Sequence, residues 1–492
     1  MSGIDLTLDR IHVLFNILPR YDRPTCHIAG TNGKGSVSAF LTSIFRSASP
    51  SYRVGRYNSP HLVSVYDCIT IDDVPVSPEV YGAARTRVEK ANEEHKTGAT
   101  SFEVLTLTAL QVFQDLKVDI AVVEVGMGGR LDATNVIPDD CILVSGLTAV
   151  DLDHQAFLGN TVADIAREKV AIARPGRPFV LSPQQHASVS LVAQEYCEKI
   201  GASLVQALVP SIRPWNVDAD GPQKTNPKLT AEHFLSPEPQ PVQISLRCFS
   251  EPLKALLPLQ GEHQLTNLGT ALTMVSAILT DPLLASSSLD LHSRITPTTT
   301  SKGIRSTVWN GRLSFHKLST PQSNKDLLVL ADGAHNPASS ATLGAYITDL
   351  LSRISNAESA EPRTITLTYI LSLSHSPPKT PLQTLSPLLP PTFSSSNIRL
   401  ISNVALLRFT PPEGMPWVKS VSPSDLKSTI TSLAPEAEVW VASDEASPEG
   451  QLKEVFGWVG EKHARAEEGL VVVAGSLYLV ADFYRLLGES NV

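Results

Sequence analysis

Apolar runs of strand length alternate with helical patterns along most of the chain. Residues 120–125 and 141–147 are nearly continuous runs of Val, Ile, Leu and small residues, whereas residues 37–45 place apolar side chains at the i, i+3, i+4, i+7 spacing of a helix. Near-continuous apolar strands that alternate with helices are typical of a parallel sheet covered on both faces. The pattern therefore predicts an α/β fold.

Polar and proline-rich segments divide this alternation. Residues 210–241 are predicted to be a loop insertion, and the Ser/Thr-rich residues 287–303 are predicted to be a linker. A second alternation follows the linker and predicts a smaller α/β domain, interrupted at residues 374–397 by a Pro/Ser-rich segment that we expect to be a mobile surface loop. We predict two domains, at residues 1–303 and 304–492.

Composition narrows the class of protein. The 492 residues are 42% apolar and 18% charged, and no run reaches the eighteen consecutive apolar residues of a membrane span. The first ten residues resemble neither a signal nor a transit peptide, so we expect a cytoplasmic monomer, with a mitochondrial pool as the alternative location. A net charge of −9 disfavours nucleic acid and anionic membranes as partners.

The five cysteines, at positions 26, 68, 141, 197 and 248, show no C-x-x-C spacing. This spacing argues against a zinc site or a disulfide framework. We expect all five cysteines to be reduced and buried.

A glycine-rich segment, GTNGKGS at residues 30–36, joins a short apolar run to a helical pattern. Backbone N–H groups at such a helix start attract anions, Lys34 adds a positive charge, and Ser36 offers a hydroxyl to Mg²⁺. Gly35 intervenes between Lys34 and Ser36, so the strict pattern G-x-x-x-x-G-K-[ST] is not met. The segment predicts a site for a nucleotide triphosphate; a glycine turn with a solvated lysine is the alternative.

Further polar residues follow the predicted strands of the first domain. Glu124 ends one strand, where ligands bind in open α/β sheets, and is a candidate Mg²⁺ ligand. His154 follows the next strand and is a second candidate, with a solvated loop histidine as the alternative. Lys169 falls on the apolar stripe of a predicted helix, where an unpaired ammonium is costly. Lys169 either reaches the surface or lies in the phosphate and metal site.

The second domain repeats this arrangement at its first strand. Residues 327–331 are apolar and end in Asp332, with His335 and Asn336 close behind, and Arg312 in the preceding Trp-Asn-Gly-Arg segment is placed to reach phosphates. Turn chemistry alone is the alternative for both segments.

Taken together, these segments resemble the Mur-ligase superfamily and, within it, the dihydrofolate synthase and folylpolyglutamate synthase family. The residues that carry the resemblance are HIAGTNGKGS (27–36), YNSPHL (57–62), SFEVLT (101–106), EVGMGGRLDATN (124–135), LDH (152–154), EK (168–169), GEHQLTN (261–267), NGR (310–312) and DGAHNP (332–337). The resemblance implies a P-loop-containing, parallel-sheet ATPase domain followed by a smaller Rossmann-like α/β domain. It also implies ATP-dependent amide formation between a pterin or folate carboxylate and L-glutamate.

The resemblance also implies roles for individual residues. ATP would be bound by Gly30, Thr31, Asn32, Gly33, Lys34, Gly35, Ser36, Asn267, Arg312 and Asp332. One or two Mg²⁺ ions would be held by Ser59, Glu124 and His154. Substrate would contact Phe102, Glu103, Arg130, Asp132, His335 and Asn336. Lys34, Lys169, His335 and Asp332 would be catalytic, with Lys169 carboxylated on its amine.

The acceptor substrate remains open between alternatives within the family. We favour dihydropteroate, which would make the protein a dihydrofolate synthase; a folylpolyglutamate synthase acting on tetrahydrofolate, or a bifunctional enzyme, is the alternative. A P-loop nucleotide-binding switch is the alternative outside the ligases. It is disfavoured because Asn324-Lys325-Asp326 misses the Asn-Lys-x-Asp spacing of GTPases.

Overall fold

The computed structural model describes residues 7–223, 228–234, 237–284, 288–320, 325–355, 363–391, 393, 395, 397–413, 415, 417–464 and 466–490. The chain divides into two compact units. The first unit comprises Met1–Trp215, Gln240–Pro258 and His263–Val308, and the second comprises Asn216–Pro239, Leu259–Glu262 and Trp309–Val492. The predicted limits of 1–303 and 304–492 remain a prediction. The grouping differs from them most at Asn216–Pro239, which belongs with the second unit.

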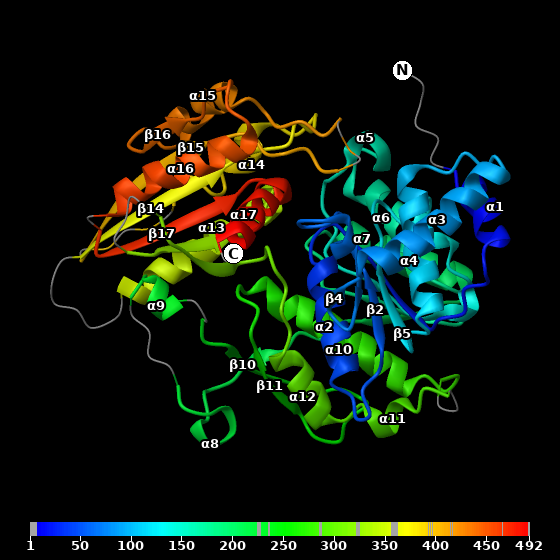
Figure 1. Ribbon diagram of the computed structural model, residues 1–492. Helices are drawn as coiled ribbons and strands as arrows, with labels where there is room; N and C mark the ends of the chain where they lie inside the picture. Colours follow the sequence, from blue (N-terminus) through cyan, green and yellow to red (C-terminus); the bar gives the residue numbers. More distant parts are fainter. Residues whose placement is uncertain are drawn as a thin grey trace. The chain divides into compact units, whose positions relative to one another are not determined.

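An eight-stranded sheet forms the centre of the first unit, in the order β4-β3-β2-β5-β1-β6-β7-β8. Figure 1 labels β2, β4 and β5 of this sheet among the helices of the unit. The strands from β2 to β8 in this order run parallel, and β3 and β4 add an antiparallel edge. The strands are β1 (Thr25–Ala29), β2 (Val54–Tyr57), β3 (Ile69–Ile71), β4 (Val74–Pro75), β5 (Ile120–Glu124), β6 (Ile142–Leu147), β7 (Pro178–Leu181) and β8 (Ser203–Gln206). The central strands β1, β5 and β6 are buried at every position, because helices cover both faces.

Helices α2 and α10 pack against strands of this sheet, while α1, α3 and α4 share one apolar cluster and α6 and α7 another. Their bounds are α1 (Asp9–Ile17), α2 (Lys34–Arg46), α3 (Pro78–Glu94), α4 (Ser101–Asp115), α5 (Gln155–Leu158), α6 (Val162–Val170), α7 (Ala187–Ile200) and α10 (His263–Thr280). Three short 3₁₀ turns lie between these elements: η1 (Val65–Cys68), η2 (Ala133–Val136) and η3 (Asp139–Cys141). The predicted α/β architecture of this part is confirmed.

The predicted linker at residues 287–303 is largely helical. Helices α11 (Leu291–Arg294) and α12 (Pro297–Arg305) lie here, and α12 packs on α2, where Ser43 Oγ donates to the Gly303 carbonyl at 2.7 Å. A capping box between Thr296 and Thr299, followed by a proline in the first turn, starts α12. Serine and threonine enrichment therefore reflected helix capping rather than a flexible connection.

The predicted loop insertion at residues 210–241 also contains ordered elements. Strands β9 (Ser211–Ile212), β10 (Gln240–Ile244) and β11 (Leu253–Leu257) form a small antiparallel sheet. The short helices α8 (Val217–Asp220) and α9 (Ala231–Phe234) lie between β9 and β10 in sequence, and Phe234 enters the core of the second unit. Residues 224–227 and 235–236 of this segment lie outside the described residues.

The second unit is built on a six-stranded sheet in the order β12-β13-β17-β14-β15-β16, in which only β12 is antiparallel to its neighbour. The strands are β12 (Ser314–Leu318), β13 (Leu327–Ala331), β14 (Arg363–Leu371), β15 (Ile398–Leu406), β16 (Glu438–Val441) and β17 (Glu468–Ala474). The helices are α13 (Pro337–Ser355), α14 (Pro381–Leu385), α15 (Pro423–Leu433), α16 (Pro448–His463) and α17 (Leu477–Ser490). The predicted second α/β domain is confirmed as an α/β unit.

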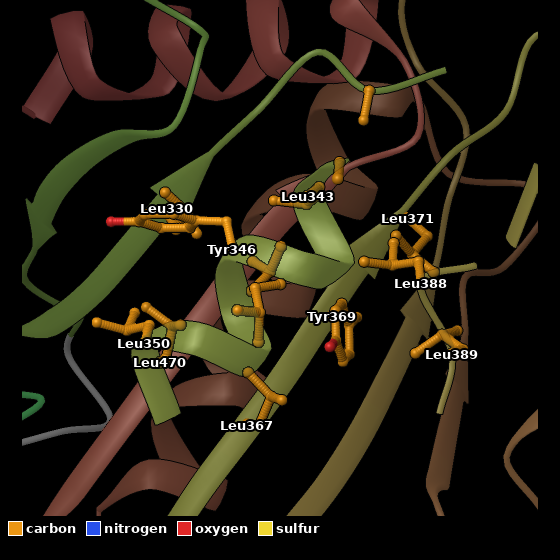
Figure 2. Packing of buried hydrophobic residues seen from close by; sticks show 14 of the residues in the cluster. Leu330, Leu343, Tyr346, Leu350, Leu367, Tyr369, Leu371, Leu388, Leu389 and Leu470 are labelled. Atoms are coloured by element: carbon orange, nitrogen blue, oxygen red, sulfur yellow. The ribbon is translucent and has the colours of Figure 1, made fainter. Parts of the chain in front are cut away.

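Figure 2 shows how α13 packs its apolar face on this sheet. Leu343, Tyr346 and Leu350 of the helix and Leu367 and Tyr369 of β14 belong to one buried cluster. Leu385, Leu388 and Leu389 join the same cluster. They come from the segment 374–397, so the described part of this predicted surface loop contributes to the core.

All five cysteines are free, and all but Cys248 are buried. Burial raises the pKa of the Cys197 thiol to about 11, so that thiol is uncharged at neutral pH. Among the described residues, no helix is long and apolar enough to cross a membrane.

Candidate active site

The glycine-rich segment connects β1 to α2, and its glycines are required by the backbone. Gly33 precedes the first residue of α2 with φ +96°, and Gly30 has φ +148°. A Cβ atom on Gly30 would lie 1.8 Å from Thr148 Oγ1, and one on Gly33 would lie 2.3 Å from Asn267 Oδ1. The loop therefore takes a path that side chains would block.

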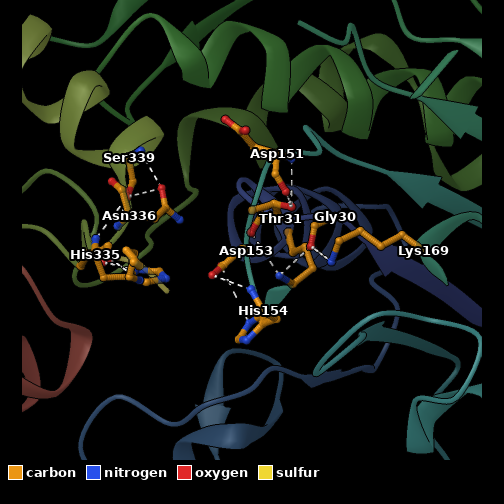
Figure 3. Close-up of polar contacts among 12 residues, drawn as sticks. Gly30, Thr31, Asp151, Asp153, His154, Lys169, His335, Asn336 and Ser339 are labelled. Atoms are coloured by element: carbon orange, nitrogen blue, oxygen red, sulfur yellow. Dashed lines mark hydrogen bonds and ion pairs between the residues drawn. The ribbon is translucent and has the colours of Figure 1, made fainter. Parts of the chain in front are cut away.

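Contacts with the residues after β6 fix the first half of this loop. The backbone N–H groups of Thr31 and Asn32 both donate to the Ala149 carbonyl, at 2.8 and 3.2 Å. The Thr31 hydroxyl donates to the Asp151 carbonyl at 3.2 Å and accepts from Asp151 N at 3.1 Å (Figure 3). The second half of the loop enters α2, where Gly35 O accepts from Ser38 Oγ at 2.8 Å.

Two lysines converge on this loop. Lys34 Nζ donates to the carbonyls of Gly30 and Thr31, at 3.1 and 3.3 Å, and Lys169 Nζ donates to the same Gly30 carbonyl at 3.0 Å (Figure 3). Lys169 is only 3% exposed. Burial and then the charge of Lys34 lower the pKa of Lys169 to about 7. Lys169 is therefore buried beside the glycine-rich loop and does not reach the surface.

Glu124 ends β5 beside this loop. Its Oε1 atom lies 3.8 Å from Lys34 Nζ, and its Oε2 atom accepts a short hydrogen bond from Asn58 Nδ2. The same amide donates to Ser38 Oγ of α2 at 2.8 Å. Asn58 thus ties the carboxylate to the helix that begins at the glycine-rich loop.

The predicted metal ligands are only partly brought together. Ser59 follows Asn58, whose amide binds Glu124, and its Oγ atom is buried without a hydrogen-bond partner among the described residues, so it could offer an oxygen to a hard cation. His154 is exposed, has φ +50°, and has its Nε2 atom 3.8 Å from Asp153 Oδ2. In the described part of the chain, no three His, Cys, Asp or Glu side chains form a metal-binding group.

The segment after β5 packs on the helix that carries Lys169. A Cβ atom on Gly129 would lie 2.7 Å from the Glu168 carbonyl and 2.9 Å from the Lys169 carbonyl. Arg130 is exposed and pairs with Glu168, Nη2 to Oε1 at 2.9 Å. This close approach places the segment that was predicted to bind substrate directly against α6.

Asp132 is buried in this segment. It accepts hydrogen bonds from Met127 N at 2.8 Å and from the backbone and hydroxyl of Thr134 at 3.0 and 2.6 Å. Burial raises the pKa of Asp132, and these hydrogen bonds oppose the rise. Thr134 Oγ1 also contacts His27 Nε2 at 2.8 Å, so Asp132 anchors the segment to β1.

Phe102 and Glu103 begin α4 and differ in their surroundings. The Phe102 ring lies so close to Gly126 that a Cβ there would be 2.3 Å from the ring tip. Glu103 instead closes a capping box: its Oε2 atom accepts from Thr100 N at 2.6 Å, and Thr100 Oγ1 accepts from Glu103 N. The Glu103 carboxylate also lies 3.5 Å from Arg10 Nε. We therefore propose that Glu103 stabilises the start of α4 and does not bind substrate.

Helix α10 joins the loop through amides. Gln264 Nε2 donates to Ser36 Oγ at 3.2 Å, and Asn267 Nδ2 donates to Gln264 Oε1 at 3.0 Å. The predicted nucleotide residue Asn267 is thus adjacent to Gly33, as the Cβ test above shows.

In the second unit, Asp332 organises the turn that carries Arg312. Its carboxylate is buried and accepts from Leu313 N and Ala334 N, both at 2.8 Å. Burial raises the pKa of Asp332, and the Arg312 guanidinium opposes the rise. Arg312 Nη1 donates to the Gly311 carbonyl at 2.8 Å.

His335 and Asn336 follow the same strand. Asn336 is buried and accepts from Ser339 N at 2.9 Å through Oδ1, which caps the start of α13 (Figure 3). His335 is half-buried, with Nδ1 at 2.9 Å from the Gly333 carbonyl, and its own carbonyl accepts from Lys379 Nζ at 2.8 Å. Asn336 therefore caps α13, and the His335 ring contacts the Gly333 carbonyl.

Three polar residues of the site were missed as individual candidates. Asn58 lies within the motif YNSPHL, and Gln264 lies within GEHQLTN. The motifs therefore included both residues, but no role was predicted for either side chain. Lys379 carried no signal, because it lies in the Pro/Ser-rich segment predicted to be a loop.

Comparison with known proteins decides the family. The family model for the dihydrofolate synthetase C-terminal domain matches residues 314–486. The chain is 33% identical over 492 residues to the dihydrofolate synthetase of Saccharomyces cerevisiae, covering 98% of both chains, and 30% identical over 487 residues to the probable dihydrofolate synthetase of Schizosaccharomyces pombe, covering 98% of this chain and 99% of the relative. This chain belongs to the dihydrofolate synthase and folylpolyglutamate synthase family.

Solved structures of this family agree in fold. The Mycobacterium tuberculosis folylpolyglutamate synthase complexed with ADP and AMPPCP has a TM-score of 0.69 to this chain at 25% identity, covering 98% of this chain and 95% of that one. The predicted family, fold class and ligase class are confirmed.

Proposed function

We propose that this protein joins L-glutamate to the carboxylate of dihydropteroate, forming dihydrofolate with release of ADP and phosphate. The observation that supports this function best is the full-length similarity to fungal dihydrofolate synthetases. The loop of residues 30–36, with two lysines on one carbonyl and Glu124 beside it, supports an ATP site of the ligase type.

The chemistry requires two steps. A carboxylate is a poor electrophile, so ATP first phosphorylates it to an acyl phosphate; the amine of glutamate then attacks this carbonyl, and phosphate leaves from the tetrahedral intermediate. Phosphoryl transfer depends mainly on alignment and charge neutralisation. Lys34, the N–H groups at the start of α2 and, from the second unit, Arg312 and Asp332 are proposed to bind the nucleotide.

Ser59 and Glu124 are proposed to hold Mg²⁺, with His154 as the third predicted ligand. The buried Ser59 hydroxyl and the Glu124 carboxylate are oxygen donors of the kind that Mg²⁺ prefers. When bound, Mg²⁺ supplies positive charge that neutralises the phosphates.

Lys169 is proposed to be carboxylated on its amine. The neutral amine attacks CO₂, the new N–C bond forms, and one proton is released. A buried lysine whose pKa is lowered to about 7 offers that neutral amine near physiological pH, and carboxylation removes the cation that burial penalises.

Substrate contacts are proposed for two groups of residues. Phe102, Arg130 and Asp132 would lie near the pterin acceptor, and His335 and Asn336 near glutamate.

The prediction of a cytoplasmic monomer stays a prediction.

A folylpolyglutamate synthase is the second candidate, because a relative of that name matches nearly the whole chain in structure. Phosphate release by the purified protein with Mg-ATP, L-glutamate and either dihydropteroate or tetrahydrofolate, with product masses measured in parallel, separates the candidates. One glutamate added to dihydropteroate alone supports the first function, serial addition to tetrahydrofolate supports the second, and both activities indicate a bifunctional enzyme. Absence of turnover with either acceptor contradicts the ligase proposal.

A further inference from the structure

The last helix of the chain contacts the turn that carries Arg312. The Tyr484 hydroxyl, on α17, accepts a hydrogen bond from Gly311 N at 3.0 Å. Gly311 has φ +72°, and its carbonyl accepts from Gly333 N at 2.9 Å and from Arg312 Nη1 at 2.8 Å. Gly311 is therefore held at its N–H by Tyr484 and at its carbonyl by Gly333 and by the guanidinium itself.

A histidine on the neighbouring strand fixes the hydroxyl in turn. His316, on β12, has its Nε2 atom 2.8 Å from the Tyr484 hydroxyl. The two rings meet edge to face, with centroids 4.9 Å apart, and Phe483 packs against both rings. Burial lowers the pKa of His316 to about 4, so its ring is neutral at physiological pH. The position of the Tyr484 hydroxyl is thus fixed by the packing of its ring as well as by hydrogen bonds.

Different contacts fix the two halves of the turn, Gly311–Arg312 on one side and Leu313 on the other. The side of Arg312 that faces the backbone is fixed by Gly311, and Leu313 N is fixed by the Asp332 carboxylate. Removing the hydroxyl of Tyr484 would leave the N–H of Gly311 without this acceptor while the Asp332 contacts stay in place. The direction of the guanidinium, rather than the fold of the sheet, is what that change would affect.

We propose that Tyr484 is a positioning residue that orients Arg312 toward the phosphates of ATP, with His316 holding its hydroxyl in place. The inference rests on the proposed function, in which Arg312 binds the nucleotide. In this role Tyr484 acts through Arg312 and has no substrate contact of its own.

The variant Tyr484→Phe tests this role, because it keeps the ring and removes only the hydroxyl. The KM for ATP is expected to rise about two- to tenfold, the range that one hydrogen bond supplies, with kcat and the KM for L-glutamate near wild-type values. Tyr478→Phe is the matched control: Tyr478 lies on the same helix and packs on Phe409, and no hydrogen bond of its hydroxyl is found among the described residues. This control should leave the KM for ATP unchanged.

A double-mutant cycle with Arg312→Gln identifies the route of the effect. If Tyr484 acts through Arg312, Tyr484→Phe has no further effect on the KM for ATP in the Arg312→Gln background. Equal effects in both backgrounds overturn the positioning role. His316→Phe, which keeps an aromatic ring, should give a smaller rise of the same kind, and it replaces Tyr484→Phe if that variant fails to fold.

The same experiment separates this inference from the proposed function. If Arg312→Gln raises the KM for ATP and Tyr484→Phe does not, Tyr484 has no positioning role and the nucleotide site stands. If Arg312→Gln leaves the KM for ATP unchanged in an active enzyme, the proposed role of Arg312 is wrong and the inference falls with it.

Discussion

Replacing Gly33 by alanine changes the loop at a defined point. Gly33 has φ +96°, and the new Cβ atom would lie 2.3 Å from Asn267 Oδ1. Asn267 is buried and donates to Gln264, which in turn donates to Ser36 of the loop. The Asn267 side chain must therefore move, and the chain of hydrogen bonds that ties α10 to Ser36 moves with it.

The expected loss has two components. An alanine in the left-handed region costs about 1–2 kcal/mol in the stability of the fold. Disturbing one buried hydrogen bond in the chain from Asn267 to Ser36 costs about 1 kcal/mol more. If the hydrogen bond worth about 1 kcal/mol is lost only in the nucleotide-bound state, ATP binds about fivefold more weakly. This follows because about 1.4 kcal/mol corresponds to a factor of ten in affinity.

Gly176→Ala is the matched control for the first component. Gly176 has φ +68° and is exposed, and a Cβ atom there would meet nothing within 4 Å. Both variants should lower the melting temperature, by roughly 1–2 °C per kcal/mol for a chain of this size. Only Gly33→Ala should raise the KM for ATP in the phosphate-release assay.

The comparison between the two variants can refute this reasoning. If Gly33→Ala has the melting temperature of Gly176→Ala and a wild-type KM for ATP, then the loop at Gly33 does not bind the nucleotide. A raised KM in both variants would instead show that the effect is general destabilisation.

Three further predictions concern single side chains. Lys34→Ala and Glu124→Ala should each abolish turnover, because they remove the cation and the carboxylate of the loop site; wild-type rates in the phosphate-release assay would contradict the assignment. Carboxylation of Lys169 requires the neutral amine, so ¹³C-bicarbonate should give a carbamate signal by NMR above about pH 7, lost as pH falls below the lowered pKa and absent in Lys169→Met. Glu103→Ala should reduce the free energy of unfolding by about 1 kcal/mol in chemical denaturation, because the cap is lost; a raised KM for dihydropteroate at unchanged stability would instead support a substrate role.

The local parts of the site were predictable from the sequence because short segments determine them. The strand that ends in Glu124 and the glycine-rich loop before α2 each follow from fewer than fifteen residues. The apolar stripe on the helix of Lys169 indicated that its amine is either buried or reaches the surface, and the side chain is buried; its place in a phosphate and metal site stays a proposal.

Other features were misread although a local signal was present, or depended on contacts between residues far apart in sequence. The residues at 287–303 read as a linker by composition, yet Thr296 and Thr299 follow the spacing of a capping box and start α12. The same spacing at Thr100 and Glu103 forms a capping box in the structure, and the predicted substrate contact of Glu103 stays a prediction. Tyr484 could not be predicted, because only the folded unit brings α17 to the turn at Gly311.

The pKa of Lys169 is lowered in part because a second lysine lies at the same turn. Lys34 and Lys169 donate to the same carbonyl, so two positive charges would face each other at the Gly30 turn. Burial first, and then the charge of Lys34, lower the pKa of Lys169 to about 7, which favours its neutral amine near physiological pH. Carboxylation would go one step further, because a carbamate beside Lys34 replaces repulsion with attraction. Lys169 would then offer an anionic oxygen of the kind that Mg²⁺ prefers.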